Sequence, residues 1–375
     1  SVIIALFLGL IISAEELISD RRILLRESYL KLSKSGYLNS KVFYLFALSA
    51  LQTFLFVLIS NSVLQIPGMI KYFWMILFAT SCFANILGLF ISSLFNSVVA
   101  IYIMVPLVIV PQILLSGVVV NFDTMNDKVS SKEVVPFTGD LIVSRWAFEA
   151  LAVTQFEFND YQKHLFSNEE QESNVKFDYL FVIPEVEKAL SELKTLTDKE
   201  KLKVKSEFVR NELFILNKHT PGENLAQYFT GSLSEINTDL IYRYLERLNS
   251  YLLNRMNTLR NVKDSIMNKL IKESGSVDEL LAFKYKNYND NLSDLLLKRK
   301  SFESFIIDNN RIISKIEPVY QVPVSKSGRA HFLSSSKIIG EFRIDTIIFN
   351  ILVIWFMSLV LYVCLYFYFK SSREF

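Results

Sequence analysis

The sequence predicts an all-α membrane protein that carries, between two of its membrane helices, a large helical domain exposed to water. The first observation is composition: 51% of the 375 residues are hydrophobic and yet 21% are charged, so apolar and charged residues must be segregated along the chain. The second is a set of apolar stretches of about 20 residues or more, the length that crosses a bilayer. The third is a long polar region, residues 121–343, with helical patterning.

The chain starts with a short apolar segment, residues 1–13, and continues with longer ones. We interpret the first as the end of a membrane helix. Because the chain begins at Ser1 without a Met and is apolar from Val2, we expect further sequence upstream. Three complete spans fill residues 42–120 and a fourth fills residues 344–369. Their predicted bounds are Val42–Leu64, Met69–Phe95, Val98–Val120 and Ile344–Phe369.

Lysine and arginine residues predict the orientation of these spans. Residues 14–41 carry six of them, and the tail, residues 370–375, carries two more. Short segments rich in these residues stay in the cytoplasm, so both are predicted to be cytoplasmic. Since three spans follow the first of these segments, residues 121–343 are predicted to be extracytoplasmic; long loops are exempt from the charge rule.

Residues 159–343 are predicted to form an extracytoplasmic helical domain. Capping sequences begin at Thr197 and Ser276, and Pro184 can occupy the first turn of another helix. Two apolar seams, interrupted by Arg255 and Arg299, predict long helices that Gly275 joins into an antiparallel hairpin. Either the stems of these arginines pack while their heads reach water, or they bind a partner. The seams are Ile241, Leu245, Leu248, Leu252, Leu259, Val262 and Ile266, and Leu281, Tyr285, Tyr288, Leu292, Leu295, Phe302 and Ile306.

The linker, residues 14–41, is predicted to be one amphipathic helix on the cytoplasmic membrane surface. At 100° per residue its charged side chains fall on one stripe, with acids first and lysines last. The pattern alone is typical of an interfacial helix that joins two spans, or of a docking surface for a cytoplasmic partner. The charged stripe is Glu16, Asp20, Glu27, Lys31 and Lys34, and the apolar side is Ile18, Leu25, Tyr29 and Leu32.

Two groups of motifs carry a resemblance to a known family. In the linker they are Glu15-Glu16-Leu17, Asp20-Arg21-Arg22, Arg26-Glu27, Gly36-Tyr37 and Ser40-Lys41. Downstream they are Leu114-Leu115-Ser116-Gly117 and Ser144-Arg145-Trp146-Ala147-Phe148-Glu149-Ala150-Leu151. Over residues 2–156 and 344–369 the chain therefore resembles the type-2 ABC transporter membrane domains, the group that includes the G subfamily of half-transporters. It departs from them in the size of its insertion and in having no nucleotide-binding domain.

The resemblance implies that the linker transmits closure of an ATPase dimer to the spans. The chain contains no G-x-x-x-x-G-K-[ST] phosphate loop, so ATP and Mg are expected on a partner ATPase domain, fused upstream or a separate subunit. A second membrane domain, identical or different, is expected to complete a dimer. The Asn96-Ser97 turn is the other expected cytoplasmic contact. The candidate coupling residues are Glu15, Glu16, Asp20, Arg21, Arg22, Arg26 and Glu27.

Polar residues within the spans are candidates for a translocation path, because such groups are costly in lipid. Hydrogen bonds between neighbouring helices are the plain alternative for each of them. By resemblance, Leu114 and Leu115 lie at an apolar plug near the outer end of the path, and residues 121–158 hold re-entrant helices at the outer face. The candidates for path or outer gate are Gln52, Thr53, Asn85, Gln112, Leu114, Leu115 and Ser116.

Two functions fit these features. The first is the membrane-spanning part of an ATP-driven exporter of an apolar or amphipathic substrate. The second is a signalling device in which ATP hydrolysis moves the outer domain to recruit or regulate an extracytoplasmic protein. The net charge of +2 argues against nucleic-acid binding, and the isolated histidines and the cysteines within apolar runs argue against a metal site. Because no outer disulfide can form, we expect a bacterial inner membrane and a periplasmic domain.

Overall fold

The computed structural model describes residues 1–28, 33–119, 122, 133–229, 237–299 and 303–371. The chain divides into two compact units. One, the membrane unit, is Ser1–Asn159 with Pro323–Phe375, and the other, the insertion unit, is Asp160–Val322. The predicted outer domain was residues 159–343, whereas the segment 323–343 lies with the membrane helices and not with the insertion.

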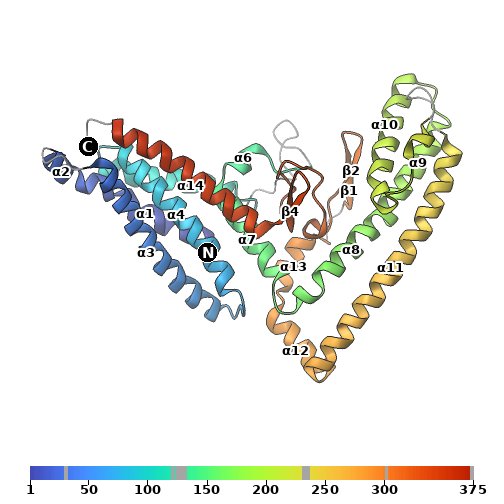
Figure 1. Ribbon diagram of the computed structural model, residues 1–375, viewed down its shortest axis with the longest axis horizontal. Coiled ribbons are helices and arrows are strands. Elements are labelled where there is room, and N and C mark those ends of the chain that lie inside the picture. The colour runs from blue at the N-terminus through green and yellow to red at the C-terminus, as the bar shows by residue number, and fades with distance from the viewer. Residues whose placement is uncertain (29–32, 120–121, 123–132, 230–236, 300–302, 372–375) are drawn as a thin grey trace. The chain divides into compact units, whose positions relative to one another are not determined.

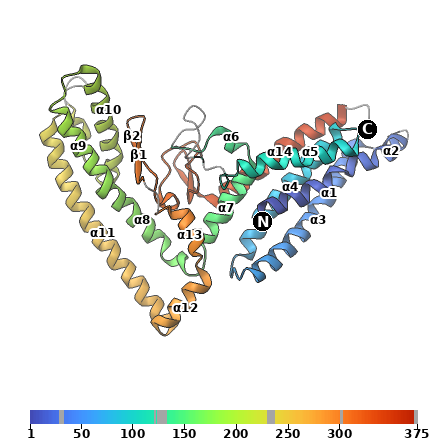
Figure 2. The same ribbon diagram turned by 180° about the vertical axis from the view of Figure 1, so that it is seen from behind.

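The membrane unit is built around helix α4 (Ile70–Leu94), as Figures 1 and 2 show. In the apolar 18-residue stretch of α4, 78% is buried, whereas the corresponding share is 22% in α3 (Lys34–Val63) and in α14 (Thr346–Ser371). Helices α1 (Val2–Ala14), α3, α14 and α7 (Val143–Glu157) all pack against α4. Helix α4 therefore forms the core, while α3 and α14 leave apolar faces outside, as helices in contact with lipid or a second membrane domain do.

Small residues allow α1 and α4 to approach closely. A Cβ atom added at Gly88 of α4 would lie 1.9 Å from the Ser13 Oγ atom of α1, and one added at Gly9 would lie 2.8 Å from the Cβ atom of Ala84. Close backbone approach at small residues is the main route to helix packing in a bilayer, where lipid removes most of the hydrophobic drive.

The set of long apolar helices differs from the predicted set at two places. Among the described residues, four helical stretches are long and apolar enough to cross a membrane: Val2–Arg21, Lys34–Val63, Ile70–Leu94 and Thr346–Ser371. The N-terminal stretch was predicted as half a span. Conversely, α5 (Val98–Leu114) ends six residues before the predicted Val120, after Pro106 and Pro111, and Gly117 in the left-handed region comes shortly after its end.

The predicted single connecting helix, residues 14–41, is wrong as one element. Helix α2 is Glu16–Ser28, and α3 begins at Lys34. The Ser33 side chain accepts a hydrogen bond from the Gly36 N–H at 3.2 Å, which is the capping contact of a new helix. Lys34 therefore belongs to α3, and Lys31, Tyr29 and Leu32 of the predicted stripes lie outside the described residues.

The membrane unit also holds a short hairpin that the all-helical expectation missed. Strands β3 (Ser336–Ile339) and β4 (Phe342–Asp345) pair antiparallel, with Ser336 opposite Asp345, and β4 leads directly into α14. Gly340, at φ +61, makes the tight turn between them. The short helix α6 (Phe137–Asp140) precedes α7. The hairpin and α6 position the buried polar network around Glu149.

The insertion unit has its own hydrophobic core. Helix α8 (Phe166–Phe177), a π-helical turn (Asp178–Val182) and α9 (Ile183–Leu193) run on from one another without a break, with Pro184 in the first turn of α9 as predicted. They run antiparallel to α11 (Thr238–Ser274), as Figure 1 shows. Helix α10 (Lys199–Leu216) completes the core. Its members include Val186, Leu190, Val209, Leu213, Leu245 and Leu248.

The first predicted seam is confirmed as far as Leu259, whereas its member Val262 is 43% exposed, and the second long helix of the hairpin is wrong. Residues Ile241, Leu245, Leu248, Leu252 and Leu259 are buried. Gly275 ends α11 at φ +96, and the chain does turn back there. In place of a second long helix the chain forms two short ones, α12 (Val277–Asn287) and α13 (Asp290–Leu297), and then the hairpin β1 (Phe305–Asp308) and β2 (Arg311–Ser314).

Capping chemistry explains the break. The Asn289 side chain accepts from the Leu292 N–H at 3.1 Å, so it starts a new helix, and Lys298 at φ +44 ends that helix. Tyr285 of the second seam is 78% exposed, Ile306 lies in β1, and Phe302 lies outside the described residues. The seam of α11 packs instead against α8 and α9.

Candidate functional site

Lys41 fastens the connecting helix α2 to the start of α3. Its Nζ atom lies 2.6 Å from Glu16 Oε2 and 2.7 Å from Asp20 Oδ2, and the three side chains are about three-quarters buried. The Tyr37 hydroxyl donates to Asp20 Oδ2 at 2.7 Å. One lysine shared by two carboxylates one turn apart, and partly shielded from water, holds two helices together more firmly than an exposed pair does.

Helix α2 also contacts α4 and the turn that follows α4. Arg21 donates from Nη1 to the Asn96 side-chain oxygen at 2.5 Å. The Ile18 N–H donates to Ser92 Oγ at 3.2 Å. Asn96 belongs to the turn that the sequence predicted as the second cytoplasmic contact. Helix α2 therefore touches the ends of α3, α4 and the α4–α5 turn at once.

The apolar side of α2 faces the protein. Leu17 and Leu24 are buried in a cluster with residues of α3, α4 and α14, so this helix docks on the bundle. The predicted apolar side began one residue later, at Ile18, which is half-buried. Of the other candidate coupling residues, Glu15 is half-buried and Arg26 is exposed. The side chains of Arg22, Leu25 and Glu27 lie outside the described part of the chain.

Several predicted path residues join helices to one another. Asn85 of α4 donates through Nδ2 to the Leu45 carbonyl at 3.2 Å and to Ser49 Oγ at 2.8 Å, both on α3. Thr53 donates to the Ser49 carbonyl at 2.6 Å within α3. Gln52, half-buried on the same helix, has an Oε1 atom without a hydrogen-bond partner among the described residues. The Asn85 Oδ1 atom likewise has no hydrogen-bond partner among the described residues, and both atoms are buried.

Gln112 caps helix α7. Its Oε1 atom accepts from the Ser144 N–H at 3.1 Å, and its carbonyl accepts from the Ser144 hydroxyl. The first N–H groups of a helix have no partner within it, so this contact stabilises the N-terminus of α7. Nearby, Leu115 is half-buried and Leu114 is 44% exposed, while the Ser116 hydroxyl donates to the Ile113 carbonyl at 2.8 Å.

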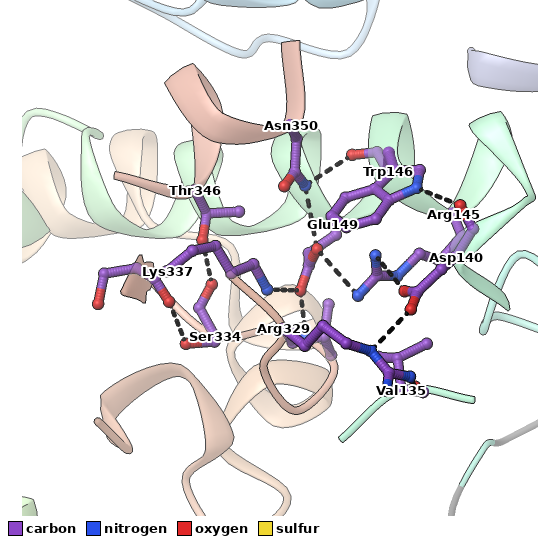
Figure 3. A network of polar contacts seen from close by, with 12 residues as sticks. Val135, Asp140, Arg145, Trp146, Glu149, Arg329, Ser334, Lys337, Thr346 and Asn350 are labelled. Carbon is purple, nitrogen blue, oxygen red and sulfur yellow. Dashed lines mark hydrogen bonds and ion pairs between the residues drawn. The ribbon is translucent and has the colours of Figure 1, made fainter. Parts of the chain in front are cut away.

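A buried ionic network lies between α7, the β3–β4 hairpin and α14 (Figure 3). At its centre Glu149 of α7 is fully buried. Its Oε1 atom lies 2.8 Å from Lys337 Nζ of β3 and accepts from the Leu333 N–H at 3.0 Å. Its Oε2 atom accepts from Asn350 Nδ2 of α14 at 3.0 Å and lies 3.6 Å from Arg145 Nη2. Both carboxylate oxygens are therefore fully occupied.

The network continues from Arg145 to α6. Arg145 is 1% exposed, stacks 3.8 Å above the Trp146 ring and lies 3.5 Å from Asp140 Oδ1. Arg329 binds Asp140 Oδ2 at 3.1 Å and donates to the Val135 carbonyl at 2.6 Å. These contacts tie the segment before α7 to the segment before β3 (Figure 3).

Burial and charge oppose one another in this network. Burial raises the pKa of Glu149, but the cations Arg145 and Lys337 outweigh it and hold that pKa below its usual value. Burial lowers the pKa of Lys337. At Asp140 burial raises the pKa and prevails over Arg145 and Arg329. A network of this kind is stable only while each charge keeps its partner, so it holds α7 in one position.

The sequence did not predict this network as a site. Arg145 and Glu149 lie four residues apart in the motif Ser144–Leu151, which the sequence analysis used for a resemblance and not as a site. Lys337 and Asn350 lie 188 and 201 residues after Glu149 and carry no local signal. The one available clue was Asn350, a single amide within an apolar span.

The two arginines of the insertion unit have polar partners. Arg255 donates to Gln171 Oε1 of α8 at 2.9 Å. Arg299 donates through Nε to Glu317 Oε1 at 2.9 Å. Their predicted binding of a partner protein stays a prediction.

Comparison with known protein families gives a match for the N-terminal part of the membrane unit. Residues 1–156 match a family model described as ABC-2 type transporter. The match begins at α1 and reaches into α7, so it includes α2 and the members Asp140, Arg145 and Glu149 of the buried network. Comparisons with curated proteins and with solved structures returned no match.

Proposed function

We propose, from the ABC-2 type transporter membrane domain that residues 1–156 form, that this chain is the permease part of an ABC transporter and exports an apolar or amphipathic substrate. An ATPase domain, upstream or on a separate subunit, drives it with ATP and Mg. A second membrane domain completes the dimer. The distribution of lysine and arginine supports a cytoplasmic α2 and an extracytoplasmic, periplasmic insertion unit in a bacterial inner membrane.

The observation that carries this proposal is the shared Lys41 contact. Because Glu16 and Asp20 of α2 both bind Lys41 of α3, a displacement of α2 is passed to α3, and Arg21 passes it to the α4–α5 turn. A rigid helix that touches three elements can convert closure of an ATPase dimer into a movement of the spans. Arg26 is exposed on the same helix and is the residue we assign to the ATPase surface.

Charge reversal on α2 tests the assignment. In the assembly with its ATPase, Arg26→Glu combined with Glu27→Arg should abolish transport while the ATPase remains active and the chain remains in the membrane. The matched control reverses an adjacent exposed pair in the insertion unit, Glu200→Lys with Lys201→Glu, and should leave transport unchanged. Transport at the wild-type rate in the α2 variant contradicts the assignment.

The second function, a signalling device that recruits an extracytoplasmic partner, is favoured by one feature. The insertion unit has a hydrophobic core of its own, formed by α8 to α11, and is not a loop that merely joins two spans. A folded unit of this size can present a fixed surface to another protein.

A further inference from the structure

The insertion unit contains a cavity of about 330 Å³ that the sequence analysis did not predict. Helices α8, α11 and α12 form its walls, together with the chain around α13. This volume lies at the lower end of the range of small-molecule sites. Its lining is Tyr161, Gln162, Leu165, Glu169, Lys263, Asp264, Met267, Lys284, Tyr288, Leu297, Arg299 and Tyr320.

One wall of the cavity is a closed hydrogen-bonded network around Glu169. Lys263 Nζ lies 2.8 Å from its Oε1 atom, and the Tyr320 hydroxyl and Gln162 Nε2 donate to its Oε2 atom at 2.6 and 2.5 Å. Burial raises the pKa of Glu169, but the hydrogen bonds from Lys263 and Tyr320 outweigh it and lower the pKa. This carboxylate is therefore ionised and already satisfied, so it does not serve as an acceptor for a ligand.

Lys284, on the α12 wall of the cavity, has a different environment from Glu169. It lies 5.6 Å from the centre of the Tyr161 ring and 5.3 Å from that of Tyr288, and these rings meet edge to face at 6.0 Å. In the part of the chain that the structure describes, no carboxylate lies within ion-pair distance of its ammonium group. Arg299 gives one of its five N–H donors to Glu317, and the rest of the guanidinium borders the same cavity.

The charged side chains of the cavity determine how many negative charges a ligand can carry. Lys263 is neutralised by Glu169 and Arg299 by Glu317, so among the described residues that line the cavity Lys284 is the cation left to pair with a guest. Asp264 is exposed at the rim, where water screens it. A second negative charge on the guest would be repelled by the Glu169 and Glu317 carboxylates. The remaining wall is apolar or aromatic, with Met267, Leu165 and Leu297.

We propose that this cavity binds a monocarboxylate with an apolar or aromatic body, whose carboxylate contacts Lys284 and Arg299. The carboxylate belongs to a free organic acid or to the C-terminus of a peptide. The inference does not rest on the transport function proposed above, because every residue that carries it lies in the insertion unit. A ligand held in this way connects α12 to the segment that follows α13.

The test is direct binding to the full chain in lipid nanodiscs at pH 7.5, with 3-phenylpropionate as the probe and its neutral amide as the comparison. For a ligand of this size we expect a Kd of about 1 mM or tighter, and binding of the amide at least about tenfold weaker. The dianion phenyl phosphate should bind less well than the carboxylate. The tripeptide Gly-Gly-Phe, with a free or an amidated C-terminus, separates the two sources. If the free tripeptide binds and the amidated one does not, the ligand is a peptide C-terminus. If 3-phenylpropionate binds and the free tripeptide does not, the ligand is a free organic acid.

Two variants on one helix make the test specific. Lys284→Gln should weaken binding of 3-phenylpropionate about tenfold or more, and Lys284→Arg should restore it. Lys286→Gln removes the same charge from an exposed position of α12 outside the cavity and should change nothing. Equal binding of the acid and its amide, equal loss in the Lys284 and Lys286 variants, or no binding of either the acid or the peptide overturns the proposal.

Discussion

Lys337 places its ammonium group 2.8 Å from the Glu149 carboxylate, and both side chains are completely buried. Glu149 precedes the insertion unit in the chain and Lys337 comes after it. The pair therefore joins the segment of the membrane unit that precedes the insertion unit to the segment that follows it. Asn350 of α14 binds the same carboxylate, so the last membrane helix is held at this point too.

Loss of one member of this pair should destabilise the membrane unit strongly. Lys337→Met leaves the Glu149 carboxylate buried with one cation fewer, and we expect a loss of about 3–5 kcal/mol in the free energy of unfolding, measured by denaturant titration in detergent. Arg329→Met removes an exposed member of the same network and should cost about 1 kcal/mol or less. Equal losses in the two variants would show that burial of the pair has no energetic role.

The membrane unit should also fold without its insertion. When residues 160–322 are replaced by a short flexible linker, the Glu149–Lys337 pair remains in the chain, and we expect the helical circular dichroism and the unfolding midpoint of the spans to be retained. If the insertion unit recruits an extracytoplasmic protein, pull-downs with the shortened chain should lose that protein. Recovery of the same partners with and without residues 160–322 contradicts the signalling function.

Glu212 should make the insertion unit sensitive to pH. This carboxyl is 1% exposed and accepts the Ile312 N–H of β2 at 2.8 Å, and burial raises its pKa to about 7. Because the folded pKa exceeds the unfolded value of 4.5, the stability that it contributes is complete below about pH 4.5 and is lost as the pH rises through 7. The difference is about 3 kcal/mol at most.

A comparison with Glu212→Gln isolates this effect. The amide cannot ionise, so the variant should gain stability relative to the wild type between pH 5 and pH 8, as measured by thermal unfolding. A constant difference between the two proteins over this range would show that Glu212 does not titrate there.

Local patterns in the sequence predicted the parts of this fold that depend on local chemistry. The apolar run of α4, the seam of α11 and the Ser276 cap each depend on residues within a few turns, and the structure contains all of them. The connecting segment was predicted as one helix because its periodicity continues through Lys34. A single hydroxyl, Ser33, ends that continuity, since a capping contact outweighs a weak helical pattern.

The buried network could not be predicted, because its members come from distant parts of the chain. Glu149 reads as an ordinary helical acid, and Lys337 reads as a surface lysine in a polar loop. Only the tertiary structure, which brings Lys337 of β3 to Glu149 of α7, removes both from water and makes them a pair. The candidates for the translocation path, in contrast, could be identified from the sequence, because they are polar residues within apolar spans. Asn85 and Gln112 are buried, and the hydrogen bonds that they make join helices.

The most direct test of the coupling mechanism is ATP-driven transport in a Lys41→Glu variant and in the swapped variant Lys41→Glu with Glu16→Lys. The single change places three acids at the contact between α2 and α3, so we expect ATP hydrolysis to continue while transport is lost. The swap restores one ion pair between the same two helices and should restore a large part of transport. Transport at the wild-type rate in Lys41→Glu would contradict the claim that α2 transmits the movement of the ATPase through this contact.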